Sequence, residues 1–135
     1  MLRIFLSSHG NFASGIKSSL DILLGKSDNV TVFDAYLDDQ NIQDVMEAFY
    51  STVNEGEQVV LLSDLYGGSV NQVMYLFLER PNTMLVAGVN LALVLELSIR
   101  ESVTEEELLD MVEQSKSMLR VVKLDDDEIE RDEFF

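Results

Sequence analysis

Cysteine and tryptophan are absent from this 135-residue chain, and proline and histidine each occur only once. Without cysteine, the chain can form neither disulfides nor thiolate metal sites, and it has no thiol nucleophile, which excludes several classes of enzyme. A reducing, intracellular setting fits this composition. The single histidine, His9, is the residue at which any imidazole chemistry must take place.

Basic residues are scarce as well: nine Lys and Arg stand against 25 Asp and Glu, so that the net charge is -16. Because nucleic-acid binding depends on Lys and Arg at the phosphates, nucleic acid is not an expected partner. No uninterrupted apolar run reaches the roughly 20 residues of a membrane helix, and no basic segment precedes the short apolar run at the start. A soluble, cytoplasmic protein is expected.

The length is that of one ordinary domain. We expect residues 1–124 to form this domain and residues 125–135 to form an acidic tail. Acidic residues dominate the tail, which therefore repels itself and has little apolar surface to bury. The tail is expected to be a frayed terminus.

Apolar patterning predicts an α/β fold with an open, mainly parallel four-stranded sheet. Short apolar or β-branched runs, which are typical of strands, occur at 2–6, 30–36, 59–62 and 84–89. Apolar residues three and four positions apart, which indicate helices, occur at 13–24, 42–53, 73–78, 91–99 and 104–119. The alternation of strand and helix favours parallel pairing with helices on both faces. Residues 120–124 can add a fifth strand at an edge of the sheet.

Polar turns follow the first, third and fourth predicted strands, at 7–10, 64–69 and 88–90. Parallel strands bring these turns to one edge of the sheet. If the first and third strands are neighbours, as in the flavodoxin-like order, His9 and Asp64 face each other there. A carboxylate bound to one ring nitrogen fixes the tautomer and leaves the other nitrogen with an outward lone pair, as in a nucleophile.

Two glycines and a serine, Gly67, Gly68 and Ser69, lead into a helix beside this pair. Their backbone N–H groups can converge on an anion at the positive end of that helix, and a phosphoryl group is the expected ligand. Positioning and charge neutralisation are most of what phosphoryl transfer requires, so neither a metal nor a cofactor is demanded.

Structural roles can explain the same residues one at a time. A single histidine is more often a surface or hydrogen-bonded structural residue, Asp64 can be a helix N-cap, and Gly67 with Gly68 can form only a tight turn. Phe12 and Tyr66 can either pack against the turns or contact a partner. The functional interpretation is favoured because imidazole, carboxylate and anion nest fall on one sheet edge.

Three motifs together resemble the enzyme IIA component of the mannose family of the bacterial phosphoenolpyruvate-dependent sugar phosphotransferase system. They are Ser-His-Gly at 8–10, Asp-Leu-Tyr-Gly-Gly-Ser at 64–69 and Ala-Gly-Val-Asn-Leu at 87–91. The similarity spans roughly 2–99. The chain departs from many relatives at Val70 and Ala92, where those relatives commonly carry proline.

This resemblance implies that His9 is phosphorylated by the phosphocarrier protein HPr and passes the group to a IIB component that serves a membrane permease. It also implies that Asp64 orients the histidine and that Gly67, Gly68 and Ser69 hold the phosphate. No IIB domain follows in this sequence, so the expected IIB partner is a separate chain. The protein would be cytoplasmic, with the permease complex as a route to the inner face of the membrane.

The family also implies a homodimer, in which a C-terminal strand pairs with the sheet of the neighbouring subunit. Residues 120–124 are the segment suited to this exchange. The apolar predicted helix at 91–99 fits burial at such an interface.

Three other functions remain alternatives. A related phosphocarrier subunit feeds a dihydroxyacetone kinase, but its third-strand turn lacks the Gly-Gly-Ser nest. A histidine-dependent phosphohydrolase or mutase places arginine before its His-Gly, where this chain has Ser8. A regulatory receiver domain with Asp64 as acceptor needs an acidic magnesium site after the first strand, which here ends in Ser-Ser-His.

Overall fold

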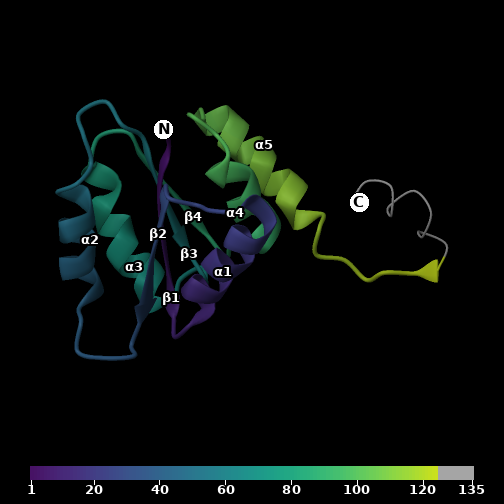
Figure 1. The fold of residues 1–135 in the computed structure, drawn as a ribbon, viewed down its shortest axis with the longest axis horizontal. Helices are drawn as coiled ribbons and strands as arrows, with labels where there is room; N and C mark the ends of the chain where they lie inside the picture. The colour runs from purple at the N-terminus through teal and green to yellow at the C-terminus, as the bar shows by residue number, and fades with distance from the viewer. Residues whose placement is uncertain (125–135) are drawn as a thin grey trace.

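A parallel sheet of four strands in the order β2-β1-β3-β4 forms the centre of the computed structural model, which describes residues 1–124 (Figure 1). The strands are β1 (Arg3–His9), β2 (Val30–Ala35), β3 (Val59–Ser63) and β4 (Thr83–Ala87). The helices are α1 (Phe12–Leu24), α2 (Ile42–Tyr50), α3 (Ser69–Tyr75), α4 (Leu91–Ser98) and α5 (Glu105–Lys116), with a 3-10 turn η1 (Leu76–Glu79) after α3. The predicted α/β class and parallel sheet are confirmed.

Alternation along the central strands divides the core into two halves. On β1, Ile4 and Leu6 pack with α1, α4 and α5, whereas Phe5 packs with α2 and α3. Successive residues of a strand point to opposite faces, so a strand that is apolar at every position is buried on both sides. Figure 1 shows the two helical layers, with α2 and α3 on one side of the sheet and α1, α4 and α5 on the other.

The register of β1 against β3 aligns their carboxyl ends. Ser7 pairs with Ser63, the last residue of β3, and on the other side His9 pairs with Ala35, the last residue of β2. The turns after β1, β2 and β3 therefore open at one edge of the sheet, as the flavodoxin-like order requires.

Some element boundaries differ from the sequence-based ones. The third helix begins at Ser69, directly after the glycine turn as expected, although its regular apolar spacing in the sequence starts only at 73; Gly68 is extended as its N-cap, and Val70 is already buried in the core. Three residues of α4, Leu93, Val94 and Leu97, are at most 2% exposed in the core, whereas Leu91 is 38% exposed; burial of this helix at a subunit interface stays a prediction.

The predicted fifth strand is not formed within this chain. Residues 120–123 belong to no helix or strand, and the ladder pairs of the described residues involve β1 to β4 only. A strand is stabilised by pairing with an edge, and this segment extends away from the sheet after α5 (Figure 1). The predicted acidic tail lies outside the described residues. Among residues 1–124, no helix has both the length and the apolar character needed to cross a membrane.

Candidate functional site

His9 is the last residue of β1 and stands at the carboxyl edge of the sheet with 42% of its side chain exposed. The turn behind it is fixed by Ser8, which is fully buried. The Ser8 hydroxyl donates to the carbonyl of Gly10 at 2.9 Å and accepts from the N–H of Ala13, in the first turn of α1, at 2.7 Å. The position before the histidine is thus occupied by a residue that holds the strand-to-helix turn, a role that sequence reasoning missed.

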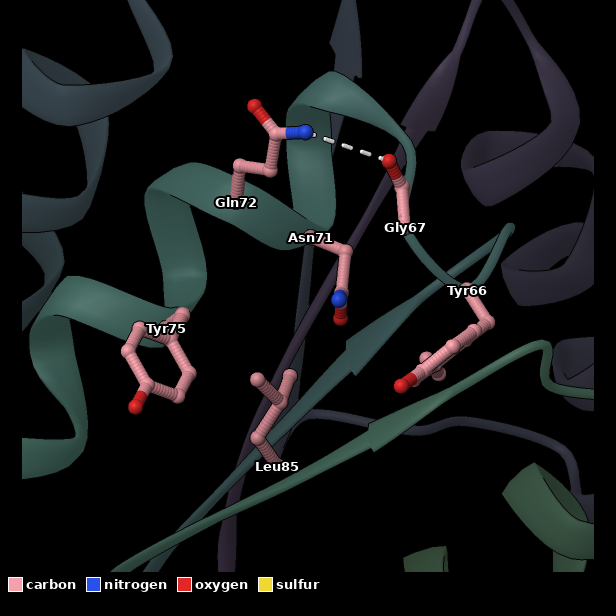
Figure 2. Close-up of a pocket in the computed structure, with 7 residues that line it drawn as sticks. Tyr66, Gly67, Asn71, Gln72, Tyr75 and Leu85 are labelled. Carbon is pink, nitrogen blue, oxygen red and sulfur yellow. Dashed lines mark hydrogen bonds between the residues drawn. The ribbon is translucent and has the colours of Figure 1, made fainter.

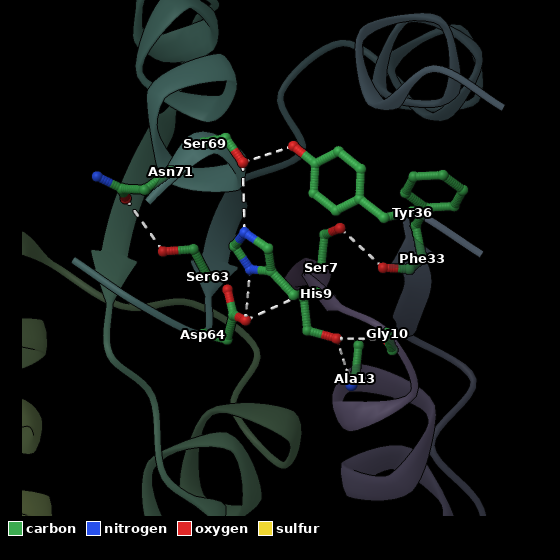
Figure 3. A network of polar contacts seen from close by, with 11 residues as sticks. Ser7, His9, Gly10, Ala13, Phe33, Tyr36, Ser63, Asp64, Ser69 and Asn71 are labelled. Atoms are coloured by element: carbon green, nitrogen blue, oxygen red, sulfur yellow. Dashed lines mark hydrogen bonds and ion pairs between the residues drawn. The ribbon is translucent and has the colours of Figure 1, made fainter. Parts of the chain in front are cut away.

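Asp64 follows β3 directly and meets His9 across the two neighbouring strands (Figure 3). One carboxylate oxygen, Oδ2, accepts from the backbone N–H of His9 at 3.0 Å and lies 2.9 Å from the ring Nδ1. The pairing expected from the strand order is therefore present in the structure. Because the N-cap of α3 is Gly68, the alternative role of Asp64 as the cap of that helix does not apply.

The ionisation of Asp64 is controlled by His9. Burial disfavours the charged carboxylate, but hydrogen bonds from the backbone and ring of His9 outweigh it, so that the pKa of Asp64 lies below its ordinary value. A carboxylate can only accept hydrogen bonds, so Nδ1 carries the proton in the neutral ring and Nε2 presents its lone pair.

Ser69 lies on the other side of the ring, with its hydroxyl 3.3 Å from His9 Nε2. It is the first residue of α3, whose N-terminus has no side-chain cap. The first N–H groups of a helix have no partner within it and can bind an anion. The structure thus brings the predicted loop residues against the nitrogen that is free to react.

The two glycines before Ser69 permit this close approach. Gly67 has a φ of 77°, a left-handed conformation that favours glycine. A Cβ at Gly68 would lie 3.3 Å from the carbonyl oxygen of Leu65 and 3.4 Å from Cε1 of His9. The imidazole therefore packs directly on the backbone of the turn.

Tyr36 is a site residue that sequence reasoning treated only as the end of a strand. It follows β2 with a φ of 68°, and its hydroxyl lies 2.5 Å from the Ser69 hydroxyl. Its ring and that of His9 have centroids 5.2 Å apart at an interplanar angle of 32°. The strand order could have pointed to Tyr36, because β2 lies beside β1 and the carboxyl ends of the two parallel strands lie at the same edge of the sheet.

Buried polar contacts hold the loops around these residues (Figure 3). The Ser63 hydroxyl donates to the Asn71 side-chain oxygen at 3.0 Å, which joins the end of β3 to the first turn of α3. The Ser7 hydroxyl donates to the carbonyl of Phe33 at 2.7 Å, which joins β1 to β2. The frame of the site is therefore fixed independently of the reacting groups.

The third polar turn, after β4, serves the fold. The backbone N–H groups of Gly88 and Val89 donate to the carbonyl of Ser63 at 3.0 and 3.2 Å. The Asn90 side chain caps α4 by accepting from Leu93 and donates to Ser115 of α5. This turn supports the end of β3 and contributes no side chain to the contacts of His9.

A pocket of about 590 Å³ adjoins the glycine turn and runs along the outer strand β4 (Figure 2). Its lining residues are Tyr66, Gly67, Asn71, Gln72, Tyr75, Leu85 and Ala87. Tyr66 is 85% exposed and Phe12 is 49% exposed, so neither ring is packed fully against the turns.

Within residues 1–124 there is no cluster of three side chains suited to hold a metal ion.

Similarity to known proteins points to one family. The family model described as PTS system fructose IIA component, where PTS stands for phosphotransferase system, matches residues 3–113. The PTS system fructose-specific EIIA component of Bacillus subtilis is 29% identical over 115 residues, which cover 82% of this chain and 78% of the relative.

Two solved structures share the fold of this chain. A putative phosphoenolpyruvate-dependent sugar phosphotransferase system permease from Klebsiella pneumoniae is similar with a TM-score of 0.79 at 27% identity, covering 88% of this chain and 89% of the other. The mannose/sorbose specific IIA subunit from Enterococcus faecalis has a TM-score of 0.78 at 23% identity, covering 91% and 96%. The latter match shows the shared fold.

Proposed function

The chain belongs to the fructose and mannose IIA component family of the sugar phosphotransferase system, and from this premise we propose that His9 is its phosphoryl carrier. Family membership itself supports a role in sugar phosphotransfer. In our proposal, His9 accepts a phosphoryl group from HPr on Nε2 and passes it to a IIB component.

One observation carries the proposal: Asp64 Oδ2 lies 2.9 Å from Nδ1 of a histidine whose side chain is 42% exposed. The ionised carboxylate keeps the proton on Nδ1 and leaves the Nε2 lone pair available to an incoming group. It also stabilises the positive charge that develops on the ring during attack on phosphorus.

The proposed transfer needs no proton to leave the ring. The Nε2 lone pair attacks phosphorus and forms the Nε2–P bond, while the bond from phosphorus to the donor breaks and its electron pair stays with the donor. Nδ1 keeps its proton and donates it in a hydrogen bond to Asp64 throughout. In the second step a nucleophile of the IIB component attacks phosphorus, and the electron pair of the Nε2–P bond returns to Nε2.

The glycine turn is the proposed phosphate cradle. Gly67 and Gly68 precede α3, and Ser69 begins it. The N–H of Gly68 donates to the carbonyl of Leu65 at 3.2 Å, so the donors that we propose for the phosphoryl oxygens are the first N–H groups of α3, which have no partner within the helix. The Ser69 hydroxyl, 3.3 Å from Nε2, is close enough to donate to a group bound there. Distribution of the equatorial charge over such donors is the main contribution that a protein makes to phosphoryl transfer.

Labelling tests the proposal directly. Incubation with phosphoenolpyruvate, enzyme I and HPr is expected to label one acid-labile, base-stable site, and His9→Ala should abolish the label because the chain has no other imidazole. A folded His9→Ala protein, judged by its circular dichroism, serves as the control for structure. Label that survives this substitution would overturn the assignment.

We also propose that two copies of the chain associate by exchanging residues 120–124. The edge strand β4 is only partly buried along its length, whereas its neighbour β3 is buried throughout. An edge strand presents unpaired N–H and C=O groups. Near the end of the described chain, Leu119, Val121, Val122 and Leu124 are 73–88% exposed, an apolar run suited to cover that edge.

Proline substitutions test this exchange. In an extended strand successive N–H groups point to opposite sides, so one of Val121→Pro and Val122→Pro should remove a pairing N–H and the other should not. The wild-type protein is expected to have the mass of two chains in light scattering, and one of the two variants should shift toward the mass of one. A wild-type mass of a single chain at all concentrations tested would exclude the dimer.

A further inference from the structure

We propose that Tyr36 is a positioning residue for phosphoryl transfer, acting on His9 through the hydroxyl of Ser69. The inference deepens the proposed function and rests on it. It begins from an unusual feature of the backbone: Tyr36 has a left-handed φ of 68° although its side chain is 61% exposed. A bulky residue disfavours this conformation, and an exposed ring contributes little packing in return.

The contacts of Tyr36 show what the conformation achieves. Its hydroxyl reaches the Ser69 hydroxyl at 2.5 Å, and its ring lies beside that of His9, with centroids 5.2 Å apart (Figure 3). Tyr36 follows β2, whereas Ser69 begins α3 on the other side of β1. The tyrosine therefore spans the end of β1 and joins two loops that flank the histidine.

The direction of each hydrogen bond follows from the number of protons available. Ionised Asp64 can only accept a hydrogen bond, so Nδ1 carries the ring proton and donates it to Asp64, and Nε2 is left as an acceptor. Ser69 then donates its single proton to Nε2, at 3.3 Å. Because that proton is used, the Ser69 oxygen must accept from Tyr36. The chain of donors runs from Tyr36 through Ser69 to His9.

Phosphorylation of His9 breaks the hydrogen bond from Ser69 to Nε2. A phosphoryl group on Nε2 occupies the lone pair that Ser69 contacts, so the Ser69 proton must turn to a phosphoryl oxygen. The Ser69 oxygen keeps its bond from Tyr36 during this rotation. A hydroxyl that accepts one hydrogen bond becomes a better donor in the next, so Tyr36 both aims Ser69 and strengthens its donation to the phosphoryl group.

Two variants separate the hydroxyl of Tyr36 from its ring. Tyr36→Phe removes the hydroxyl and keeps the ring and backbone, whereas Tyr36→Asn removes the ring and tolerates the left-handed backbone. Tyr50→Phe, which removes a hydroxyl bonded to Thr83 at 3.0 Å at the opposite end of the sheet, is the matched control. Tyr36→Phe should slow phosphoryl transfer and shorten the phosphohistidine half-life by roughly three- to tenfold, the range of one neutral hydrogen bond.

A double-mutant cycle with Ser69→Ala identifies the route of the effect. Because Tyr36 acts through Ser69, Tyr36→Phe should have little further effect on transfer when Ser69→Ala is already present. An equal loss in both backgrounds, or no loss in either, would refute the inference. Tyr36→Asn should lose at least as much as Tyr36→Phe, and Tyr50→Phe should match the wild-type transfer rate.

Nitrogen chemical shifts of the His9 ring provide a second measurement that needs no phosphate donor. In the unphosphorylated protein, Tyr36→Phe should change the Nε2 shift while Nδ1 keeps its proton, since only the Ser69 contact is altered. Unchanged Nε2 shifts would mean that Tyr36 does not position Ser69. A wild-type protein that takes no label would instead overturn the proposed function, and with it the phosphoryl-state role of Tyr36, while the shift comparison still decides the contact.

Discussion

The first and last residues of β1 each contact an acidic residue that flanks β3, but the two ends differ in whether the basic side chain keeps a nitrogen lone pair that can react. At the first residue, the Arg3 guanidinium lies 3.4 Å from Glu57 and donates to the carbonyl and hydroxyl of Thr52 at 3.0 and 2.9 Å. The same cation lies 4.9 Å over the ring of Phe49. The N–H donors and the planar face of the Arg3 guanidinium therefore make contacts that stabilise the fold.

At the other end of β1, the two ring nitrogens of His9 have partners of different kinds. Asp64 binds Nδ1 and the backbone N–H, while the Ser69 hydroxyl, which can rotate away, is the only hydrogen-bond partner of Nε2 within residues 1–124. An acid beside a strand end is thus a structural contact where the basic partner has no lone pair, and a source of reactivity where the partner keeps one. Arginine cannot give up its proton in a protein, whereas imidazole exposes a lone pair near neutral pH.

Replacing each acid by its amide should separate these roles, and the largest expected effect is that of Asp64→Asn on the rate of phosphoryl transfer. Asp64→Asn keeps an oxygen that can accept from Nδ1 but removes the charge that stabilises the ring during attack on phosphorus. We expect phosphoryl transfer to slow by roughly ten- to a hundredfold. Rapid-quench measurement of label uptake from phosphorylated HPr gives this rate.

Glu57→Gln is the matched control at the opposite end of β1. It should lower the melting temperature, because the contacts of Arg3 weaken, and leave the transfer rate at the wild-type value. Asp64→Asn should also lose some stability, since its amide would place N–H groups at the buried Oδ1 position, which has no hydrogen-bond partner among the described residues. Equal transfer rates in the two variants would remove the distinction between the two ends.

Much of this arrangement could be predicted from the sequence, because buried parallel strands are apolar at nearly every position and their order places polar turns together. The contact of His9 with Asp64 is an example: two residues 55 positions apart meet because β1 and β3 are neighbours in register. The tight turn at Gly67 was predictable as well, since glycine allows the left-handed conformation that other residues disfavour; that this turn holds a phosphate stays a prediction.

Tyr36 and Ser8 could not be assigned their roles in this way. The position of the Tyr36 ring depends on a left-handed backbone at a non-glycine residue, which no apolar pattern encodes. Ser8 looks like any strand residue until the turn brings the N–H of Ala13 to its hydroxyl. Residues 120–124 were expected to form a strand, but β-propensity is realised only where an edge is available, and the edge proposed for them belongs to a second copy.

The smallest expected effect is on stability as a function of pH. The pKa of Asp64 is below its ordinary value in the folded protein, so its ionised form favours the native state. This contribution is complete above the ordinary carboxyl pKa of about 4 and is lost as the pH falls through the lower native value. Between pH 7 and pH 3, the difference in melting temperature between the wild-type protein and Asp64→Asn should therefore shrink. A constant difference would contradict a pKa of Asp64 that is lower in the folded protein than in the unfolded chain.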